Sequence, residues 1–144
     1  MPTQSNEAIG ELLEKYKTAV YAKDVEAFLA LFEPDARIFD MWVEWSYDGI
    51  DSWRAMVTQW FDALNSERDV VEFHDVRTKL SGDMAAVEAF VQFTAVSAEG
   101  KKLRSMQERL TWTLVRKGGA WRIAHQHTSG PIDFKTMKVI LQRP

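Results

Sequence analysis

The chain has 144 residues, which predicts one domain over residues 1–144, and 46% of the residues are hydrophobic, enough for a sizeable core. The formal net charge is −3 and there is no strongly basic block, so nucleic acid is excluded as an expected partner. The chain has no cysteine, which excludes disulfides and thiol catalysis, and it shows neither a signal peptide nor an apolar run of membrane-spanning length; we therefore expect a cytoplasmic protein with no membrane partner.

The first half of the chain has helical periodicity. Apolar residues recur at helical spacing over residues 9–20, with Ser5 as the expected cap, and Asp24 is placed to cap a second, short helix. Residues 36–43 predict a short strand, and apolar residues over 53–64 predict a third helix.

The second half predicts strands over residues 70–80, 85–97, 102–116 and 121–129, separated by short turns. Such short connections favour antiparallel pairing. Helices followed by an antiparallel meander predict an α+β fold, in which three N-terminal helices pack on a strongly curved, mostly antiparallel sheet that forms a cone with an internal cavity.

This order of elements resembles the nuclear-transport-factor-like superfamily, and within it the SnoaL-like and ketosteroid-isomerase-like group. The segments that carry the resemblance are residues 32–41 with 47–49, residues 109–111 with 116–121, and residues 121–129. The last segment is also similar to the end of the association domain of calcium/calmodulin-dependent kinases. The superfamily includes isomerases, cyclases, dehydratases, transport factors and assembly domains, so the resemblance implies a fold and not one reaction.

Asp40 is the first candidate for catalysis. Both faces of its strand carry bulky apolar residues, so Asp40 is flanked by hydrophobic side chains whichever way it points. Loss of hydration there would raise the pKa of Asp40 and suit it to proton transfer near neutrality. Resemblance to ketosteroid isomerases implies that Asp40 holds the position of the general base. The alternative is an aspartate at a strand end that bonds a turn or faces water.

Tyr16 lies on the apolar face of the first predicted helix. The same resemblance implies that Tyr16 donates a hydrogen bond to a substrate oxyanion, and that Thr111 stands where those isomerases hold a protonated acid. Tyr16 could equally be a core tyrosine whose hydroxyl has one partner.

Arg109 has the same strand parity as Thr111, so both are candidates to line the cavity and bind substrate. A guanidinium inside the cavity would need an anionic partner such as Asp40, Glu88 or a ligand carboxylate. Alternatively, Arg109 faces solvent or a subunit interface. Glu108 has the opposite parity and is expected to be exposed.

The last predicted strand carries polar residues on both of its faces. Read as regular extended chain, it places His125 and His127 on one face with Trp121 and Ile123. The resemblance implies that the other face, with Gln126 and Thr128, lines the cavity, so both are candidates for substrate binding.

The paired histidines could ligate a metal, but no third ligand stands at a telling spacing. We favour packing of His125 and His127 on the outer face of the sheet against a neighbouring subunit. No metal and no cofactor are therefore expected.

Trp42 and Trp45 follow the first predicted strand, where helix packing does not account for them. They are candidates for an aromatic wall or lid around an apolar ligand.

Three functions remain open. The first is an enzyme for proton transfer, isomerisation or elimination on an apolar oxygenated ligand, with Asp40 as base: an isomerase like ketosteroid isomerase, or a lyase, that works without metal. The second is a non-catalytic module that binds a small apolar or carbonyl-bearing ligand. The third is an assembly module that forms a homodimer through the sheet face.

Overall fold

The computed structural model describes residues 2–144, which form three helices and a six-stranded sheet. Two strands precede the third helix and four follow it. The helices are α1 (Pro2–Ala22), α2 (Val25–Leu29) and α3 (Ile50–Ala63). The strands are β1 (Phe32–Phe39), β2 (Tyr47–Asp48), β3 (Arg68–Ser81), β4 (Met84–Val96), β5 (Lys102–Lys117) and β6 (Ala120–Ser129).

The helices form where the apolar periodicity predicts them, with one difference at the start. Asp24 caps α2, and its side chain accepts a hydrogen bond from the backbone N–H of Ala27 at 3.0 Å, which confirms the predicted cap. Ser5 does not cap α1, because the helix begins at Pro2. The Ser5 hydroxyl instead accepts a hydrogen bond from Arg116 of β5 at 3.2 Å and ties the first turns of α1 to the sheet.

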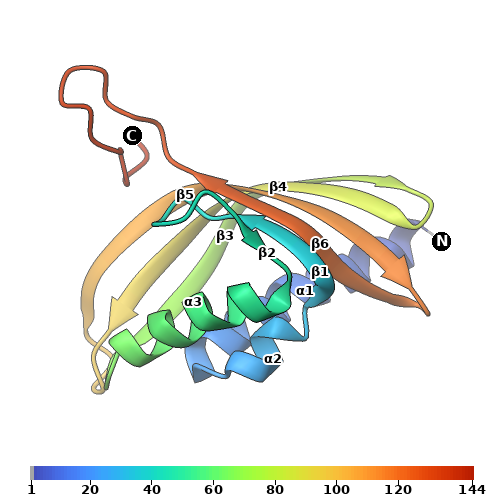
Figure 1. Ribbon diagram of the computed structural model, residues 1–144, viewed down its shortest axis with the longest axis horizontal. Coiled ribbons are helices and arrows are strands. Elements are labelled where there is room, and N and C mark those ends of the chain that lie inside the picture. The colour runs from blue at the N-terminus through green and yellow to red at the C-terminus, as the bar shows by residue number, and fades with distance from the viewer. Residues whose placement is uncertain (1) are drawn as a thin grey trace.

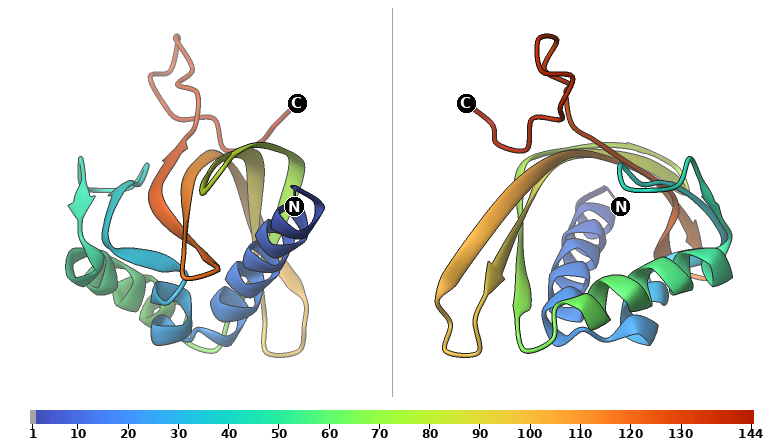
Figure 2. Two further views of the ribbon diagram at one scale, coloured as in Figure 1. Left: turned by 90° about the vertical axis from the view of Figure 1, so that its right-hand side faces the viewer. Right: turned by 60° about the vertical axis from the view of Figure 1, so that its left-hand side comes forward.

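The strands lie in the order β2-β1-β6-β5-β4-β3, and every pair is antiparallel except β1 with β6. Strand β1 ends at Phe39, earlier than predicted, so Asp40 lies just beyond the strand. The long strands β3, β4 and β5 bend over α1 and α3 without closing into a barrel, as both views of Figure 2 show. The predicted α+β fold with a curved, mostly antiparallel sheet is confirmed.

The concave face of the sheet packs on the helices and encloses the core (Figure 1). Apolar residues alternate toward this face along each strand, as a half-buried sheet requires. Among the largest fully buried side chains are Trp112, Phe28, Phe32, Leu29 and Ile38. Aromatic rings from helix and sheet meet edge to face at Tyr16 with Phe73 and at Trp53 with Phe32, which adds to the stabilisation from their burial.

A β-bulge interrupts β6 at Ala124. Thr113 of β5 pairs with His125, while the next residue, Leu114, pairs with Ile123, so Ala124 is the extra residue. Because one extra residue reverses the side-chain alternation, Trp121 and Ile123 are buried on the concave side. The expectation that they share a face with the histidines is therefore wrong.

The segment after β6 leaves the sheet and returns to the edge of β5 (Figure 1). The backbone N–H of Gln107 donates to the carbonyl of Leu141 at 2.7 Å, and Gln142 donates to the carbonyl of Ser105 at 2.6 Å. These contacts bring Leu141 to the rim of the cavity described below. Within residues 2–144, no helix is both long enough and apolar enough to cross a membrane.

Candidate functional site

A cavity of about 640 Å³ lies between the concave face of the sheet and helices α1 and α3. Its aromatic lining comes from Tyr16, Trp42, Trp53, Trp60 and Phe93. Its polar lining comes from Asp40, Gln59, Asp69, Arg104, Ser105, Glu108, Gln126 and Thr128. A cavity of this size with a few polar groups on mostly apolar walls is typical of a small-molecule site.

Asp40 follows β1 and is held by two hydrogen bonds. The hydroxyl of Thr128 lies 3.2 Å from Oδ1, and the backbone N–H of Trp42 donates to Oδ2 at 3.3 Å. Burial raises the pKa of Asp40, and these two hydrogen bonds lower it by a smaller amount. The structure thus places Asp40 in the cavity, beside apolar groups, as the strand pattern predicts.

Glu108 is a second carboxyl group in the lining of the cavity, and it is only 6% exposed. Burial, followed by the negative charge of Asp40, raises the pKa of Glu108 to about 7, while hydrogen bonds from Thr128 and Trp42 lower it. The arrangement is a coupled pair in which Asp40 ionises first and Glu108 keeps its proton to near neutrality.

The expectation that Glu108 is exposed is wrong, and the sequence contains the signal that would have placed it. Glu108 has the same strand parity as Leu110, Trp112 and Leu114, which are all buried. An apolar alternation of this kind marks the concave face. The predicted lining, Arg109 and Thr111, has the more polar parity, which the structure places on the opposite face.

Arg109 and Thr111 consequently face outward, and the prediction that they line the cavity is corrected. Both are exposed on the convex side of β5. The guanidinium of Arg109 donates to the Ser129 hydroxyl at 3.0 Å rather than pairing with Asp40 or Glu88.

Tyr16 projects from α1 into the aromatic core and is 2% exposed. Its ring lies edge to face with Phe28 at 4.9 Å and with Phe73 at 5.4 Å. Burial, and then the charges of Glu108, Asp40 and Asp69, raise its pKa well above 10. The Tyr16 hydroxyl therefore remains protonated and can act as a hydrogen-bond donor in the cavity.

Gln126 and Thr128 point from β6 into the cavity, on the face opposite His125 and His127. The side-chain oxygen of Gln126 accepts a hydrogen bond from Trp112 Nε1 at 2.9 Å. This contact orients the amide and leaves its nitrogen as the group that can donate to a ligand.

The two candidate tryptophans lie in different environments. Trp42 lines the cavity, whereas Trp45 is 96% exposed and does not reach it, so the predicted wall contains only the first of them. Trp45 borders a second hollow, of about 680 Å³, together with Phe39 and His127. The segment that carries both tryptophans forms a partition between the two hollows, since Trp42 and Val43 line both.

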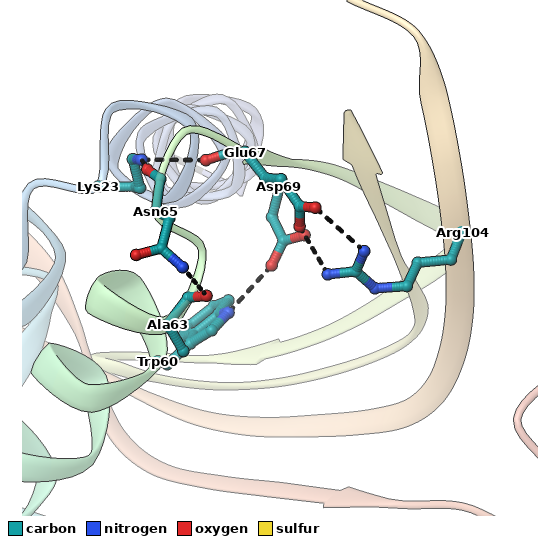
Figure 3. Close-up of polar contacts among 7 residues, drawn as sticks. All are labelled: Lys23, Trp60, Ala63, Asn65, Glu67, Asp69 and Arg104. Atoms are coloured by element: carbon teal, nitrogen blue, oxygen red, sulfur yellow. Dashed lines mark hydrogen bonds and ion pairs between the residues drawn. The ribbon is translucent and has the colours of Figure 1, made fainter. Parts of the chain in front are cut away.

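Asp69, at the start of β3, is a further buried carboxyl group that sequence reasoning missed. Trp60 of α3 donates its indole N–H to Oδ2 of Asp69 at 2.9 Å. Figure 3 shows this contact and, beside it, Arg104 reaching from β5 to the carboxylate of Glu67, with its shorter contact at 2.7 Å. Burial raises the pKa of Asp69, and the Trp60 bond and the Arg104 charge oppose that shift.

The histidine pair lies on the convex side of the sheet. His125 Nδ1 is 2.6 Å from the carbonyl oxygen of Arg37, and both imidazoles lie edge-on to the ring of Phe39. Among residues 2–144, no group of three or more His, Asp or Glu side chains is arranged to hold a metal ion.

A profile of the SnoaL-like domain matches residues 9–133 of the chain. The chain has no match among curated proteins.

Solved structures share the fold. An NTF2-like protein of unknown function from Pseudomonas putida KT2440 aligns with a TM-score of 0.86 and 22% identity, over 99% of this chain and 98% of that one. A candidate calcium/calmodulin-dependent protein kinase II association domain from Xanthomonas campestris aligns with a TM-score of 0.68 and 20% identity, over 84% of each chain. A candidate aromatic ring hydroxylase from Novosphingobium aromaticivorans aligns with a TM-score of 0.74 and 22% identity, over 90% of each chain. These likenesses confirm the predicted fold resemblance, but similarity at this level carries no activity across.

Proposed function

The chain belongs to the SnoaL-like domain family, and we propose that it binds an apolar, oxygenated small molecule in its cavity and transfers a proton on it. The observation that carries this proposal is the buried Asp40–Glu108 pair beneath an aromatic lining. Two neighbouring carboxyl groups with separated pKa values can act as base and acid in one reaction at neutral pH.

In the proposed reaction, Asp40 is the base. Its ionised carboxylate removes a proton from a carbon next to the ligand carbonyl, and electron density moves onto the carbonyl oxygen. Glu108, still protonated, donates to that oxygen, and the Tyr16 hydroxyl is a second donor in the same cavity. Glu108 thus takes the part that resemblance had assigned to Thr111.

The destination of the proton that Asp40 has removed then determines the class of reaction. Returning it to a different carbon isomerises the ligand. In an elimination, the carbonyl re-forms as its oxygen returns the proton to Glu108, a carbon–carbon double bond forms as the leaving group departs from the next carbon, and Asp40 passes its proton to that leaving group. Neither route requires a metal or a cofactor, so the proposal is a metal-independent isomerase or lyase. Trp42, Gln126 and Thr128 would bind the ligand and Trp45 would lie outside the site.

The proposal can be tested with 2-tetralone, a bicyclic ketone with acidic hydrogens next to its carbonyl. We expect the protein to accelerate exchange of these hydrogens for deuterium in heavy water, followed by proton NMR. Asp40→Asn should reduce the protein-dependent exchange by about 100-fold or more, because an amide cannot accept the proton. Asp35→Asn, the same change at an exposed position on β1, should leave it unchanged.

Two outcomes would argue against catalysis. Exchange at the rate of buffer alone, with saturable quenching of tryptophan fluorescence by 2-tetralone, would favour the non-catalytic binding module. Undiminished exchange in Asp40→Asn would remove Asp40 from the role of base.

A homodimer is a second proposal, compatible with the first. Exposed apolar side chains gather around the second hollow and in the segment after β6, where Val43 is 90%, Trp45 96% and Phe134 93% exposed. A second copy that covered this side of β1 and β6 would bury them. Sedimentation at micromolar concentration should give a dimer, and a strictly monomeric profile would contradict it.

A cytoplasmic location, proposed from the composition, would be tested by fractionating cells.

A further inference from the structure

The cavity has a second polar end, distinct from the Asp40–Glu108 pair. Asp69, Ala95 and Arg104 lie directly across from one another on β3, β4 and β5. Arg104 and Glu108 are four residues apart on β5, a separation of about 13 Å along an extended strand. The Asp69 end and the Asp40–Glu108 end can therefore contact opposite ends of one elongated ligand.

The charges that line the cavity are unbalanced. Three of the four Asp, Glu, Lys or Arg residues in the lining carry carboxyl groups: Asp40, Asp69 and Glu108, of which Glu108 keeps its proton to near neutrality. The fourth, Arg104, is already paired with Glu67 through contacts of 2.7 and 3.4 Å. Carboxyl groups in an apolar enclosure are costly without a partner, so a cation is the ligand group that would complement this cavity.

Asp69 is positioned to contact a cationic group of a ligand. It is 8% exposed, lines the cavity, and uses Oδ2 to accept the hydrogen bond from Trp60. Its other oxygen, Oδ1, makes no hydrogen bond to another residue in the described part of the chain, 2–144. Trp60 thus fixes the orientation of the carboxylate while leaving one oxygen available to a donor.

Aromatic rings flank this carboxylate. The ring of Trp60 meets that of Phe93 nearly perpendicularly, with centroids 5.7 Å apart, and both residues line the cavity. The faces of aromatic rings attract cations, most strongly in the case of tryptophan. A carboxylate beside these rings suits an alkylammonium group better than a neutral hydroxyl or an anion.

We propose that the ligand of this cavity carries a protonated amine, which pairs with Asp69 beside the rings of Trp60 and Phe93. This inference rests on the proposed function, because it assigns the substrate of that same cavity to amines that also carry an oxygenated, apolar portion. Asp69 is then a specificity-determining residue, and the chemistry takes place at Asp40 and Glu108.

The test uses three probes that share one ring system and differ in charge: 2-naphthylmethylamine, protonated at neutral pH, neutral 2-naphthylmethanol and anionic 2-naphthoate. Calorimetric titration of the full chain should give about tenfold tighter binding of the cation than of the alcohol, and the weakest binding for the anion. Equal affinity for the cation and the alcohol, or a preference for the anion, would overturn the proposal.

Two variants test whether Asp69 is the source of the preference for the cation over the alcohol. Asp69→Asn keeps an oxygen that can accept from Trp60, so the fold should persist; the cation should then bind within about twofold of the alcohol. Asp75→Asn, the same change at an exposed position on β3, should keep the preference. Persistence of the preference in Asp69→Asn, or its loss in Asp75→Asn, would contradict the assignment.

Glu67→Gln gives a second, independent test in which no lining residue of the cavity is itself substituted. It removes the carboxylate that holds Arg104, so the guanidinium can turn to Asp69 and compete with a cationic ligand. We expect the preference for the cation to fall by about fivefold, and an unchanged preference would contradict the proposal. Calorimetry measures binding and tetralone exchange measures catalysis, so failure of this inference is distinguishable from failure of the proposed function.

Discussion

Strands β5 and β6 carry polar residues on both faces, and the two faces differ in almost every physical respect. On the concave face, Glu108 and Thr128 are buried in the cavity; Thr128 donates a hydrogen bond to Asp40, and the charge of Asp40 raises the pKa of Glu108. On the convex face, Arg109 and Thr111 are exposed to solvent. Residues adjacent in sequence therefore have opposite environments, and burial gives Glu108 the raised pKa that acid–base chemistry near neutrality requires.

The largest difference should appear in catalysis. Glu108→Gln retains the size of the side chain but removes its transferable proton, so exchange of 2-tetralone should fall by about 100-fold. The matched change on the exposed face of β4, Glu88→Gln, should leave exchange unchanged. NMR of the ketone in heavy water measures both, and a similar rate in the two variants would remove Glu108 from the site.

The same substitution should stabilise the fold at alkaline pH. The pKa of Glu108 is raised to about 7 from its ordinary value of 4.5, so between these values the folded protein binds more protons than the unfolded chain. The free energy of unfolding contributed by this group is therefore fully present below the lower value and is lost as the pH rises through about 7.

At about pH 8, wild type bears the cost of a buried ionised carboxyl group, and Glu108→Gln should raise the free energy of unfolding by about 2 kcal/mol. Urea denaturation should show this gain at about pH 8 and much less of it at about pH 5. Equal stability of the two proteins at alkaline pH would mean that Glu108 has an ordinary pKa.

Two threonines give a smaller, matched contrast. The hydroxyl of Thr128 accepts from the backbone N–H of Met41 at 3.0 Å and lies 3.2 Å from Asp40 Oδ1. Thr128→Val should lower the free energy of unfolding by about 1–2 kcal/mol, because it leaves these partners unsatisfied. Thr111→Val on the exposed face should change it by less than about 0.5 kcal/mol, and chemical denaturation of both variants measures the difference.

The smallest effect is expected at Arg109. Its guanidinium contacts Ser129 on the convex face and has no part in the cavity. Arg109→Ala should leave tetralone exchange unchanged and shift the free energy of unfolding by less than about 0.5 kcal/mol. A large loss of exchange in this variant would return Arg109 to the site from which the structure removes it.

The fold followed from the sequence because its signals are local. Apolar periodicity located the three helices, and alternation between short turns located the long strands. The resemblance of residues 121–129 to a known family then supplied the curved sheet, which the pattern alone does not specify.

The site was only partly predictable, for three reasons. Asp40 and Tyr16 sit among apolar neighbours, so their place in the cavity could be anticipated. Arg109 was misplaced because polar residues were assigned to the cavity, although the buried parity of β5 is the apolar one that includes Glu108.

The second reason is the bulge at Ala124. It reverses the alternation within β6, and the sequence of β6 contains no residue pattern that marks its position. Asp69 was missed for a third cause: its partners Trp60 and Arg104 come from other elements, and their convergence depends on the curvature of the sheet.

The pH dependence of tetralone exchange tests most directly whether the Asp40–Glu108 pair performs proton transfer. After subtraction of the buffer rate, kcat/KM for wild type should fall as the pH rises through about 7, because Glu108 then loses the proton it donates. In Glu108→Gln the residual exchange should lack this alkaline limb. A wild-type profile that is flat from about pH 5 to about pH 9, or an alkaline limb that persists in Glu108→Gln, would contradict the account.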